Sequence, residues 1–435
     1  MSFFNYYSKF KEYNKNIQLI LISSALISIG RGIILGTVFS VFVKAIGGTN
    51  ESLGFLSTFG GLIMTITLFP TGYFTDKVPR QRLIRFGTIF TVLGFLLFII
   101  SNDIVILFIG QGFFSFSMGL TRPSIESLTA DSVQSGKRES IYAEIYFTRQ
   151  FFNAAGPALA MILFIVLGDL WDIEIMRQVI AVGSIFTFIG AYYQYKLSDN
   201  YSLGSESESV EIPFSKPDPF SNNNNDQVHR FSHIFRNYQE KWWYNPIPLA
   251  LILLGFIVGL GAGMTVRFFP IFFKEVYLLP PTVTNLIFTI AAILTGLVGL
   301  ISPILAKKIG KVETMFLVQF IAIICLLIIA LIPPLIIVFI AFIWRGAFMN
   351  SSQPIQKSIL MDYVPKKNRG KWNALQVLTF GFLWSLSAGI GGILLDRYDF
   401  PLLYYTTAVL YVFGTFPLLL LRPYIKKDVK NIIRV

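Results

Sequence analysis

The sequence predicts an all-α protein that crosses a membrane many times, with twelve transmembrane helices in two pseudo-symmetric six-helix bundles. Three observations lead to this fold class: an unusually apolar composition, a series of long uncharged segments, and a polar pattern that occurs twice. Hydrophobic residues make up 54% of the 435 residues and charged residues only 14%. A soluble protein carries about 25% charged residues, so this composition indicates a protein surrounded by lipid.

Twelve apolar segments are long enough to cross a hydrocarbon layer of about 30 Å. They lie at about residues 17–43, 52–74, 83–101, 104–127, 140–166, 176–196, 247–273, 283–304, 313–332, 335–359, 372–394 and 401–421. Six segments come before a long polar stretch and six come after it. We therefore expect residues 1–196 to form an N-terminal six-helix bundle, and residues 246–435 a C-terminal six-helix bundle with a tail.

The polar stretch between the two sets, residues 197–245, is rich in Ser and Asn and contains the run NNNN. It cannot bury enough apolar surface to fold alone. We therefore expect a flexible linker that joins the two bundles.

Basic residues gather in the loops on one side of the predicted bundles. They include Lys9, Lys11, Lys15, Lys77, Arg80, Arg82, Arg85, Lys137, Arg138, Lys307, Lys308, Lys311, Lys366, Lys367, Arg369 and Lys371. Lys and Arg accumulate in cytoplasmic loops, so we expect both termini and the linker to be cytoplasmic. This bias accounts for the net charge of +12, and we expect no nucleic-acid partner. The residues leave open whether the membrane is the plasma membrane or that of an organelle.

A pattern of polar residues occurs once in each predicted bundle. Pro123, Asp131 and Arg138 recur in the second bundle as Pro354, Asp362 and Arg369, all three at one constant offset, which is called the repeat offset here. The repeat offset also places Gly310 over Pro79. Internal symmetry of this kind is typical of transporters in which one half rocks against the other around a site near the middle of the membrane.

The hinge between the second and third segments reads GYFTDKVPRQRL. Its Gly72, Asp76 and Arg80 resemble the pattern G-x-L-A-D-R-x-G-R-K, which the major facilitator superfamily carries between helices 2 and 3. The hinge departs from that pattern with Phe74 in place of Leu, Lys77 in place of the first Arg and, most notably, Pro79 in place of the second Gly. The pairs Gly156-Pro157 and Arg345-Gly346 also resemble features of the family. The resemblance covers both halves, and it is specific for the fold and nearly silent on the substrate.

The resemblance implies that the hinge is part of a cytoplasmic gate. The residues implied in this gate are Gly72, Asp76, Arg80, Asp131, Arg138, Asp362 and Arg369. Asp76 would lie near the N-terminus of helix 11, where the helix dipole favours an anion, and Arg80 would pair with Asp131. Alternatively, these charges only fix the orientation of the chain in the membrane.

Four arginines inside the apolar segments are candidates for substrate binding: Arg31, Arg345, Arg267 and Arg149. A charge at the centre of a bilayer costs at least about 2.5 kcal/mol, so such residues usually have a function. In the superfamily, helices 1, 4, 7 and 10 line a central cavity, which the first three would then face. Surplus arginine favours an anionic solute, because guanidinium binds carboxylate and phosphate through two hydrogen bonds.

Structural roles for these arginines are the alternative. Arg149 has Glu126 and Glu144 nearby and could pair with either acid, which would only tie helices together. Arg267 could extend outward to the interface of the membrane. Glu126 and Glu144 are also the candidates for proton coupling, because His229 and His233 both fall in the linker. Proton symport, uniport and anion exchange therefore all remain open.

The residues contain no metal-ligand cluster, no nucleophile–base set and no phosphate-binding glycine loop, so we expect no enzyme, no metal and no cofactor. We expect a monomeric secondary transporter that moves a small solute, an organic anion or a partly anionic metabolite, across the lipid bilayer by alternating access. The alternatives are a proton-coupled carrier of a neutral or cationic solute, such as a sugar or a drug-like molecule, and a non-transporting sensor or scaffold with the same fold.

Overall fold

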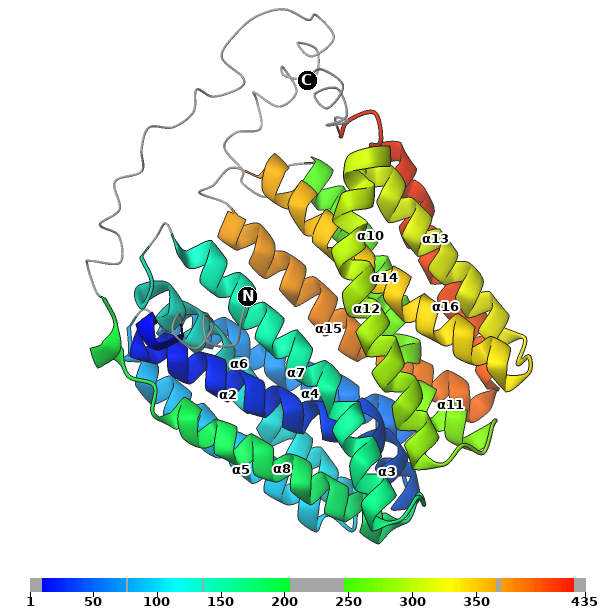
Figure 1. Ribbon diagram of the computed structural model, residues 1–435, viewed down its shortest axis with the longest axis horizontal. Helices are drawn as coiled ribbons and strands as arrows, with labels where there is room; N and C mark the ends of the chain where they lie inside the picture. The colour runs from blue at the N-terminus through cyan, green and yellow to red at the C-terminus, as the bar shows by residue number, and fades with distance from the viewer. Residues whose placement is uncertain (1–9, 76, 135–136, 204–245, 365–368, 426–435) are drawn as a thin grey trace, which may run out of the picture.

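The chain forms a polytopic bundle of helices in the computed structural model, which describes residues 10–75, 77–134, 137–203, 246–364 and 369–425. Eleven helices in these ranges are long and apolar enough to cross a membrane. The 29-residue helix α15 (Arg369–Arg397) completes the twelve spans that the sequence predicts. Figure 1 shows the blue-to-green helices of the first half packed beside the green-to-red helices of the second half.

The first half contains six spans. They are α2 (Lys15–Ile33), which continues through a π-helical turn (Ile34–Val38) into α3 (Phe39–Ala45), then α4 (Asn50–Phe74), α5 (Arg80–Ile100), α6 (Ile104–Asp131), α7 (Arg138–Leu167) and α8 (Ile173–Tyr195). Residues 197–203 stay with this half, because the amide of Leu203 donates to the carbonyl of Asp131 (2.9 Å) and Asn16 donates to the carbonyl of Ser198 (2.9 Å). We therefore propose that the linker begins after them.

The second half repeats this plan. Its elements are α10 (Pro246–Val266), α11 (Phe269–Glu275), α12 (Pro281–Ile309), α13 (Lys311–Ala330), α14 (Leu335–Tyr363), α15, α16 (Phe400–Thr415) and a final 3-10 helix (Phe416–Leu421). The first residues of α4, α5, α6 and α7 precede those of α12, α13, α14 and α15 by the repeat offset in every case. The π-helical turn of the first span corresponds in the same way to the interruption between α10 and α11. The repeat seen in the sequence is therefore a repeat of structure.

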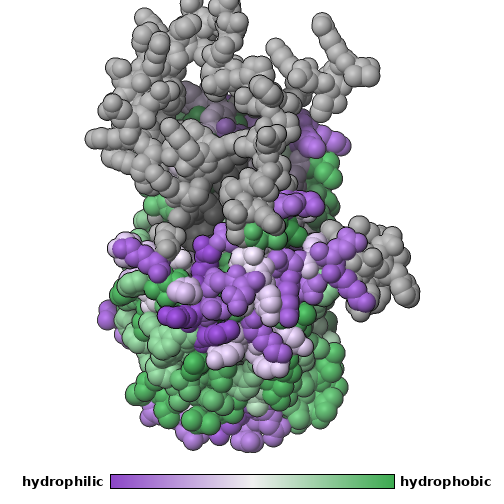
Figure 2. All heavy atoms as spheres, turned by 90° about the vertical axis from the view of Figure 1, so that its left-hand side faces the viewer, coloured by the Kyte–Doolittle hydropathy of each residue, from purple (hydrophilic) through white to green (hydrophobic). Residues whose placement is uncertain are grey.

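The two ends of the bundle differ in their polar and basic side chains. The end that contains Arg80, Asp131, Lys311 and Asp362 is called the basic end here, and the end that contains α3 and α11 is called the opposite end. Figure 2 shows hydrophilic side chains gathered in one zone of the visible face and a broad hydrophobic flank beside it. At the opposite end, helices α6, α8 and α16 begin with an aspartate that accepts backbone N–H groups: Asp103, Asp172 and Asp399. Such caps stabilise a helix start by about 1 kcal/mol.

Glycines allow α2 and α7 to cross at close range. A Cβ atom added to Gly156 would lie 2.2 Å from the backbone carbon of Gly32, which is well inside van der Waals contact. Small residues of this kind let membrane helices approach and pack. The contact ties the first span to the fifth and fixes the position of both.

The Gly156→Ala substitution should therefore lower stability, because overpacking against a backbone costs roughly 1–3 kcal/mol. We expect a lower melting temperature of the purified protein in detergent. Gly36→Ala is the matched control, since a Cβ atom there would meet its nearest neighbour, Cγ of Pro157, at an ordinary 3.6 Å. Equal melting temperatures for Gly156→Ala and the wild type would contradict the close crossing.

The two halves touch mainly through two pairs of helices, α4 with α15 and α7 with α12, and also where α3 meets α11 and the π-helical turn meets α12. The hydrogen bonds and ion pairs that join described residues of the two halves lie towards the opposite end. They include Lys44–Glu275 (3.6 Å), Thr37–Asn285 (2.6 Å), Glu51 N–H to Asp396 (2.7 Å), Thr58 to the carbonyl of Ser385 (2.8 Å), Trp171 to the carbonyl of Leu279 (2.8 Å) and Thr282 N–H to Asp169 (2.8 Å). This end of the molecule is closed.

Glycines on α4 and α15 show how the contact between the halves changes along its length. A Cβ atom on Gly61 would lie 2.1 Å from Cβ of Ser385, whereas one on Gly72 or Gly381, nearer the basic end, would meet nothing within 4 Å. The two helices therefore pack tightly towards the opposite end and leave room around these glycines.

Candidate functional site

Arg31 lies in the middle of the first span. One side of this helix, α2, is not packed against other helices of the first half. Helix α2 packs against α7 and α8, and α6 packs against α4 and α5, while α2 and α6 barely touch each other. The guanidinium of Arg31 sits over the ring of Phe114 on α6, 5.7 Å from the ring centroid. Its Nε atom is buried and has no hydrogen-bond partner among the described residues.

Three other arginines lie close enough to interact electrostatically with Arg31. They are Arg122 on α6, Arg149 on α7 and Arg267 in the interruption between α10 and α11. These four residues are called the arginine cluster. Three of them belong to the first half and Arg267 belongs to the second, so the cluster spans the boundary between the halves.

Two members of the cluster have polar neighbours that the structure shows directly. Arg149 Nε donates to Ser24 Oγ (3.3 Å), which links α7 to α2 rather than to a carboxylate. Arg122 Nε lies 3.9 Å from Glu126 Oε1, one turn along the same helix. Within the described ranges, Glu126 is thus the carboxylate that pairs with a member of the cluster, and it is more than half exposed.

The cluster carries an excess of positive charge, and its members are only partly exposed. Two like charges 4 Å apart repel by roughly 4 kcal/mol at an effective dielectric constant of about 20, and less at greater separation. A single half-exposed carboxylate cannot compensate four guanidinium groups. An anion placed among them would, and each guanidinium offers a planar fork of donors that fits a carboxylate or phosphate.

Arg345 lies outside the arginine cluster and has different neighbours. It is only 6% exposed, and its guanidinium lies over the ring of Phe269 (4.5 Å) and near that of Phe342 (5.7 Å). It lines a cavity whose walls come from α10, α13, α14, α15, α16 and the final 3-10 helix, all in the second half. The structure therefore separates Arg345 from the other three arginines that the sequence singled out.

The implied gate residues that the structure describes lie at the basic end, where the two halves carry equivalent ion pairs. Arg80 pairs with Asp131, as expected. Lys311 Nζ pairs with Asp362 (2.6 Å) at the two positions that the repeat offset relates to Arg80 and Asp131. Each pair joins the start of one helix to the end of the next within a single half.

The other gate residues differ in how much the structure describes. Arg138 Nε donates to the carbonyls of Ala130 (3.0 Å) and Val133 (3.3 Å), and so holds the end of α6. Gly72 has open space around it. Asp76 lies outside the described residues, and so does the side chain of Arg369, whose backbone begins α15.

The two candidate coupling acids both lie towards the basic end and both have partners. Glu126 faces Arg122, and Glu144 Oε2 accepts a hydrogen bond from the hydroxyl of Tyr13 (2.6 Å). Glu126 is the one that adjoins the arginine cluster.

Arg122 is the member of the cluster that the sequence analysis did not select. The sequence contains a feature that could have identified Arg122, because it is a charged residue inside the apolar segment 104–127. Its nearness to Glu126 in the sequence favours a local ion pair, however, and only the fold brings it within electrostatic reach of Arg31.

Comparisons with known proteins agree with this architecture. The family model described as Major Facilitator Superfamily matches residues 20–350 and, in a second match, 251–434. The nucleoside transporter NupG is similar in structure, with a TM-score of 0.68 and 14% identity over 94% of this chain and 99% of that one.

Two inward-facing structures are similar to the same degree. A bacterial homologue of the iron transporter ferroportin has a TM-score of 0.69 and 13% identity, over 93% of this chain and 98% of that one. A bacterial homologue of the human lysosomal transporter Spinster has a TM-score of 0.69 and 14% identity, over 95% of this chain and 97% of that one. At these identities the likeness is one of fold. No curated protein shows a significant match in sequence.

Proposed function

The chain belongs to the major facilitator superfamily, and from this premise we propose that it is a secondary transporter of a small organic anion. The arginine cluster is the observation that carries the proposal. It brings four guanidinium groups from both halves within electrostatic reach of one another, and Glu126, more than half exposed, is the carboxylate that pairs with the cluster among the described residues. A site between two halves that rock against each other is where such a carrier must bind its solute.

The chemistry of the cluster favours a carboxylate or phosphate ester over a neutral or cationic solute. Each guanidinium can give two parallel hydrogen bonds to such a group. A cation would add to the repulsion that already exists among Arg31, Arg122, Arg149 and Arg267. A neutral sugar would leave this repulsion among the arginines uncompensated.

A panel of metabolites tests this proposal, because a bound solute raises the stability of the protein by mass action. We expect anionic metabolites, and not their neutral amides or esters, to raise the melting temperature. A metabolite that does so should also be taken up by proteoliposomes. Stabilisation by the neutral analogues alone would overturn the anion proposal, and stabilisation without uptake would indicate a sensor.

We further propose that the basic end faces the cytoplasm and that the chain is seen in an inward-facing state. The accumulation of Lys and Arg at the basic end supports this orientation.

The tight contacts at the opposite end support the inward-facing state, since they block access from that side. The inward-facing relatives share this fold, and we expect the protein to work as a monomer with both halves in one chain.

Cysteine labelling tests the orientation. In a Cys325→Ser background, cysteines introduced at Ser205 and Val435 should resist membrane-impermeant reagents in intact cells and react after permeabilisation. A cysteine at Asn102, an exposed position at the opposite end, is the control that should react from outside. Labelling of Ser205→Cys in intact cells, with the protein at the surface, would reverse the orientation.

The residues at the basic end are proposed to form a gate whose contacts are weak. Exposed ion pairs such as Lys311–Asp362 contribute about 0–1 kcal/mol each, so two conformations of similar free energy can interconvert. Asp76→Asn should leave the folded protein intact yet slow transport, because it shifts this equilibrium. Arg82→Gln is the control, as it removes an exposed charge from the same hinge. Equal uptake by both variants, at matched expression, would reduce the hinge to an orientation signal.

A further inference from the structure

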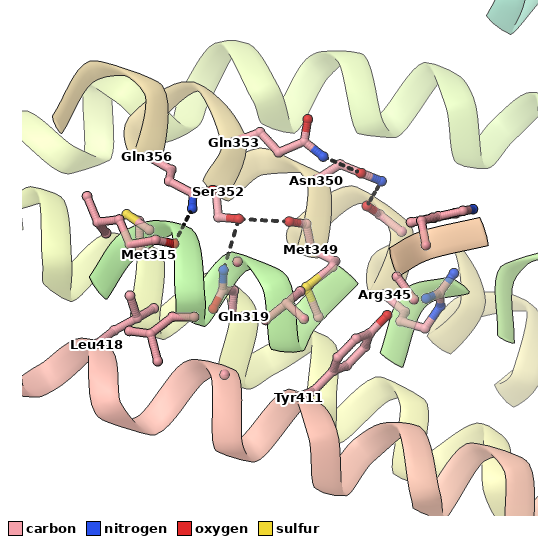
Figure 3. Close-up of a pocket in the computed structure, with 18 of the residues that line it drawn as sticks. Met315, Gln319, Arg345, Met349, Asn350, Ser352, Gln353, Gln356, Tyr411 and Leu418 are labelled. Atoms are coloured by element: carbon pink, nitrogen blue, oxygen red, sulfur yellow. Dashed lines mark hydrogen bonds between the residues drawn. The ribbon is translucent and has the colours of Figure 1, made fainter. Parts of the chain in front are cut away.

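The second half contains a cavity of about 140 Å³ that the proposed substrate site does not use. It lies between α10 and α14, over α13 and α16. Figure 3 shows Met315 and Leu418 at one end and Arg345 and Tyr411 at the other. Each water in bulk liquid occupies about 30 Å³, so the space accommodates a small ion together with water.

Most polar groups along the cavity wall already have partners. Gln319 Nε2 donates to Ser352 Oγ (3.1 Å) and Gln356 Nε2 donates to the carbonyl of Leu251 (2.9 Å). Figure 3 shows these bonds at the end away from Arg345. This end of the cavity therefore has no need of a ligand.

The end at Arg345 is different, because its polar groups are buried and unpartnered within the described part of the chain. The Nε atom of Arg345 and the hydroxyl of Tyr411 have no hydrogen-bond partner. Tyr411 is completely buried and Arg345 is 6% exposed. The hydroxyl of Tyr411 is directed towards the guanidinium but does not meet it with hydrogen-bond geometry.

These groups also lack a compensating negative charge. No described carboxylate forms an ion pair with Arg345, and the faces of Phe269 and Phe342 supply only part of the compensation. Water alone can satisfy the donors but cannot neutralise the guanidinium. A buried charge left in this state is strongly disfavoured, so an anion is the expected occupant.

We propose that this end of the cavity binds a small monovalent anion, held by the guanidinium of Arg345 and the hydroxyl of Tyr411. The volume of the cavity accommodates a halide or a carboxylate as small as formate. The site is an accessory one, separate from the arginine cluster, although Val266 of its wall directly precedes Arg267 in the chain.

Thermal unfolding of the purified full chain tests the site, with chloride or formate replacing gluconate at constant ionic strength. Wild type should show a saturable rise in melting temperature with at least one of the two anions. Tyr411→Phe removes one hydroxyl and keeps the ring, and Arg345→Met removes the charge and keeps the length. Each should raise the half-saturating concentration at least tenfold. Chloride and formate separate the two sources of the anion, since a response to formate alone assigns the site to a carboxylate.

Two controls separate this site from other causes. Tyr277→Phe removes a hydroxyl of the same half that donates to the carbonyl of Pro333 (2.6 Å), and it should keep the wild-type response. Arg31→Lys alters the arginine cluster and should also keep it. No response in the wild type, an unchanged response in Tyr411→Phe, or a response lost in Arg31→Lys would each overturn the proposal. None of these results depends on the organic solute, so the transport proposal stands or falls separately.

Discussion

Joining Lys44 to Glu275 should abolish transport. These residues form an ion pair (3.6 Å) between α3 and α11 at the opposite end, so cysteines in their places can be joined by a short bismaleimide. Alternating access requires this end to open, and a covalent link prevents the two halves from separating there. We expect uptake by Lys44→Cys/Glu275→Cys, in a Cys325→Ser background, to fall to background after linking. Binding of a stabilising solute should survive, because the basic end stays free.

The unlinked double variant should still transport, because an exposed ion pair is worth only about 0–1 kcal/mol. Asn102→Cys/Arg177→Cys is the matched control. Its two positions are also in contact near the opposite end (Arg177 Nη2 to Asn102 Oδ1, 2.6 Å), but both belong to the first half. Linking them should leave uptake unchanged. Undiminished uptake by the linked Lys44→Cys/Glu275→Cys protein would show that the closed end does not open during transport.

Replacing Arg31 should weaken solute binding without harming the fold. Arg31→Lys keeps the charge but loses the two-pronged donor geometry, which should cost on the order of 1.5–3 kcal/mol, or about tenfold or more in affinity. Arg31→Met removes the charge while an apolar chain of similar length still packs on Phe114. It should weaken binding further and leave the melting temperature of the solute-free protein unchanged or higher, since it relieves repulsion within the cluster.

A purely structural arginine predicts the reverse, namely poor expression and early unfolding with normal affinity in the surviving protein. Both quantities should be measured on the same purified samples. Arg397→Ala is the control, because it removes an exposed arginine at the end of α15, away from the cluster. If the Arg31 variants unfold early yet bind normally, a neutral or cationic solute becomes the better hypothesis.

The spans could be predicted from the sequence because lipid imposes one requirement on every membrane helix: enough apolar residues to cross it. The predicted segment 104–127 became α6, Ile104–Asp131, and most other ends agree within a few residues. The interruptions at Ile34–Val38 and between α10 and α11 were not predicted. Each interruption changes the backbone conformation of an apolar segment but not its amino-acid composition. Hydropathy therefore gives no sign of it.

The grouping of the arginines could not be predicted, because it depends on how each helix is rotated. Membrane helices are apolar on nearly all sides, so the residues do not show which face turns inward. Arg31 and Arg345 look alike in the sequence, one in each half near mid-span. The fold brings Arg31 within electrostatic reach of Arg122 and Arg267, and it buries Arg345 among aromatic rings of the second half.

Lys44 and Glu275 are separated by the repeat offset, so they occupy the same place in the two halves of the repeat and meet at its pseudo-two-fold axis. A homodimer made from two copies of the first half would bring two ammonium groups together at this point, and one made from two copies of the second half would bring two carboxylates together. Only unlike halves attract each other there. The charge pair at the closed end therefore favours association of the first half with the second and disfavours association of two identical halves.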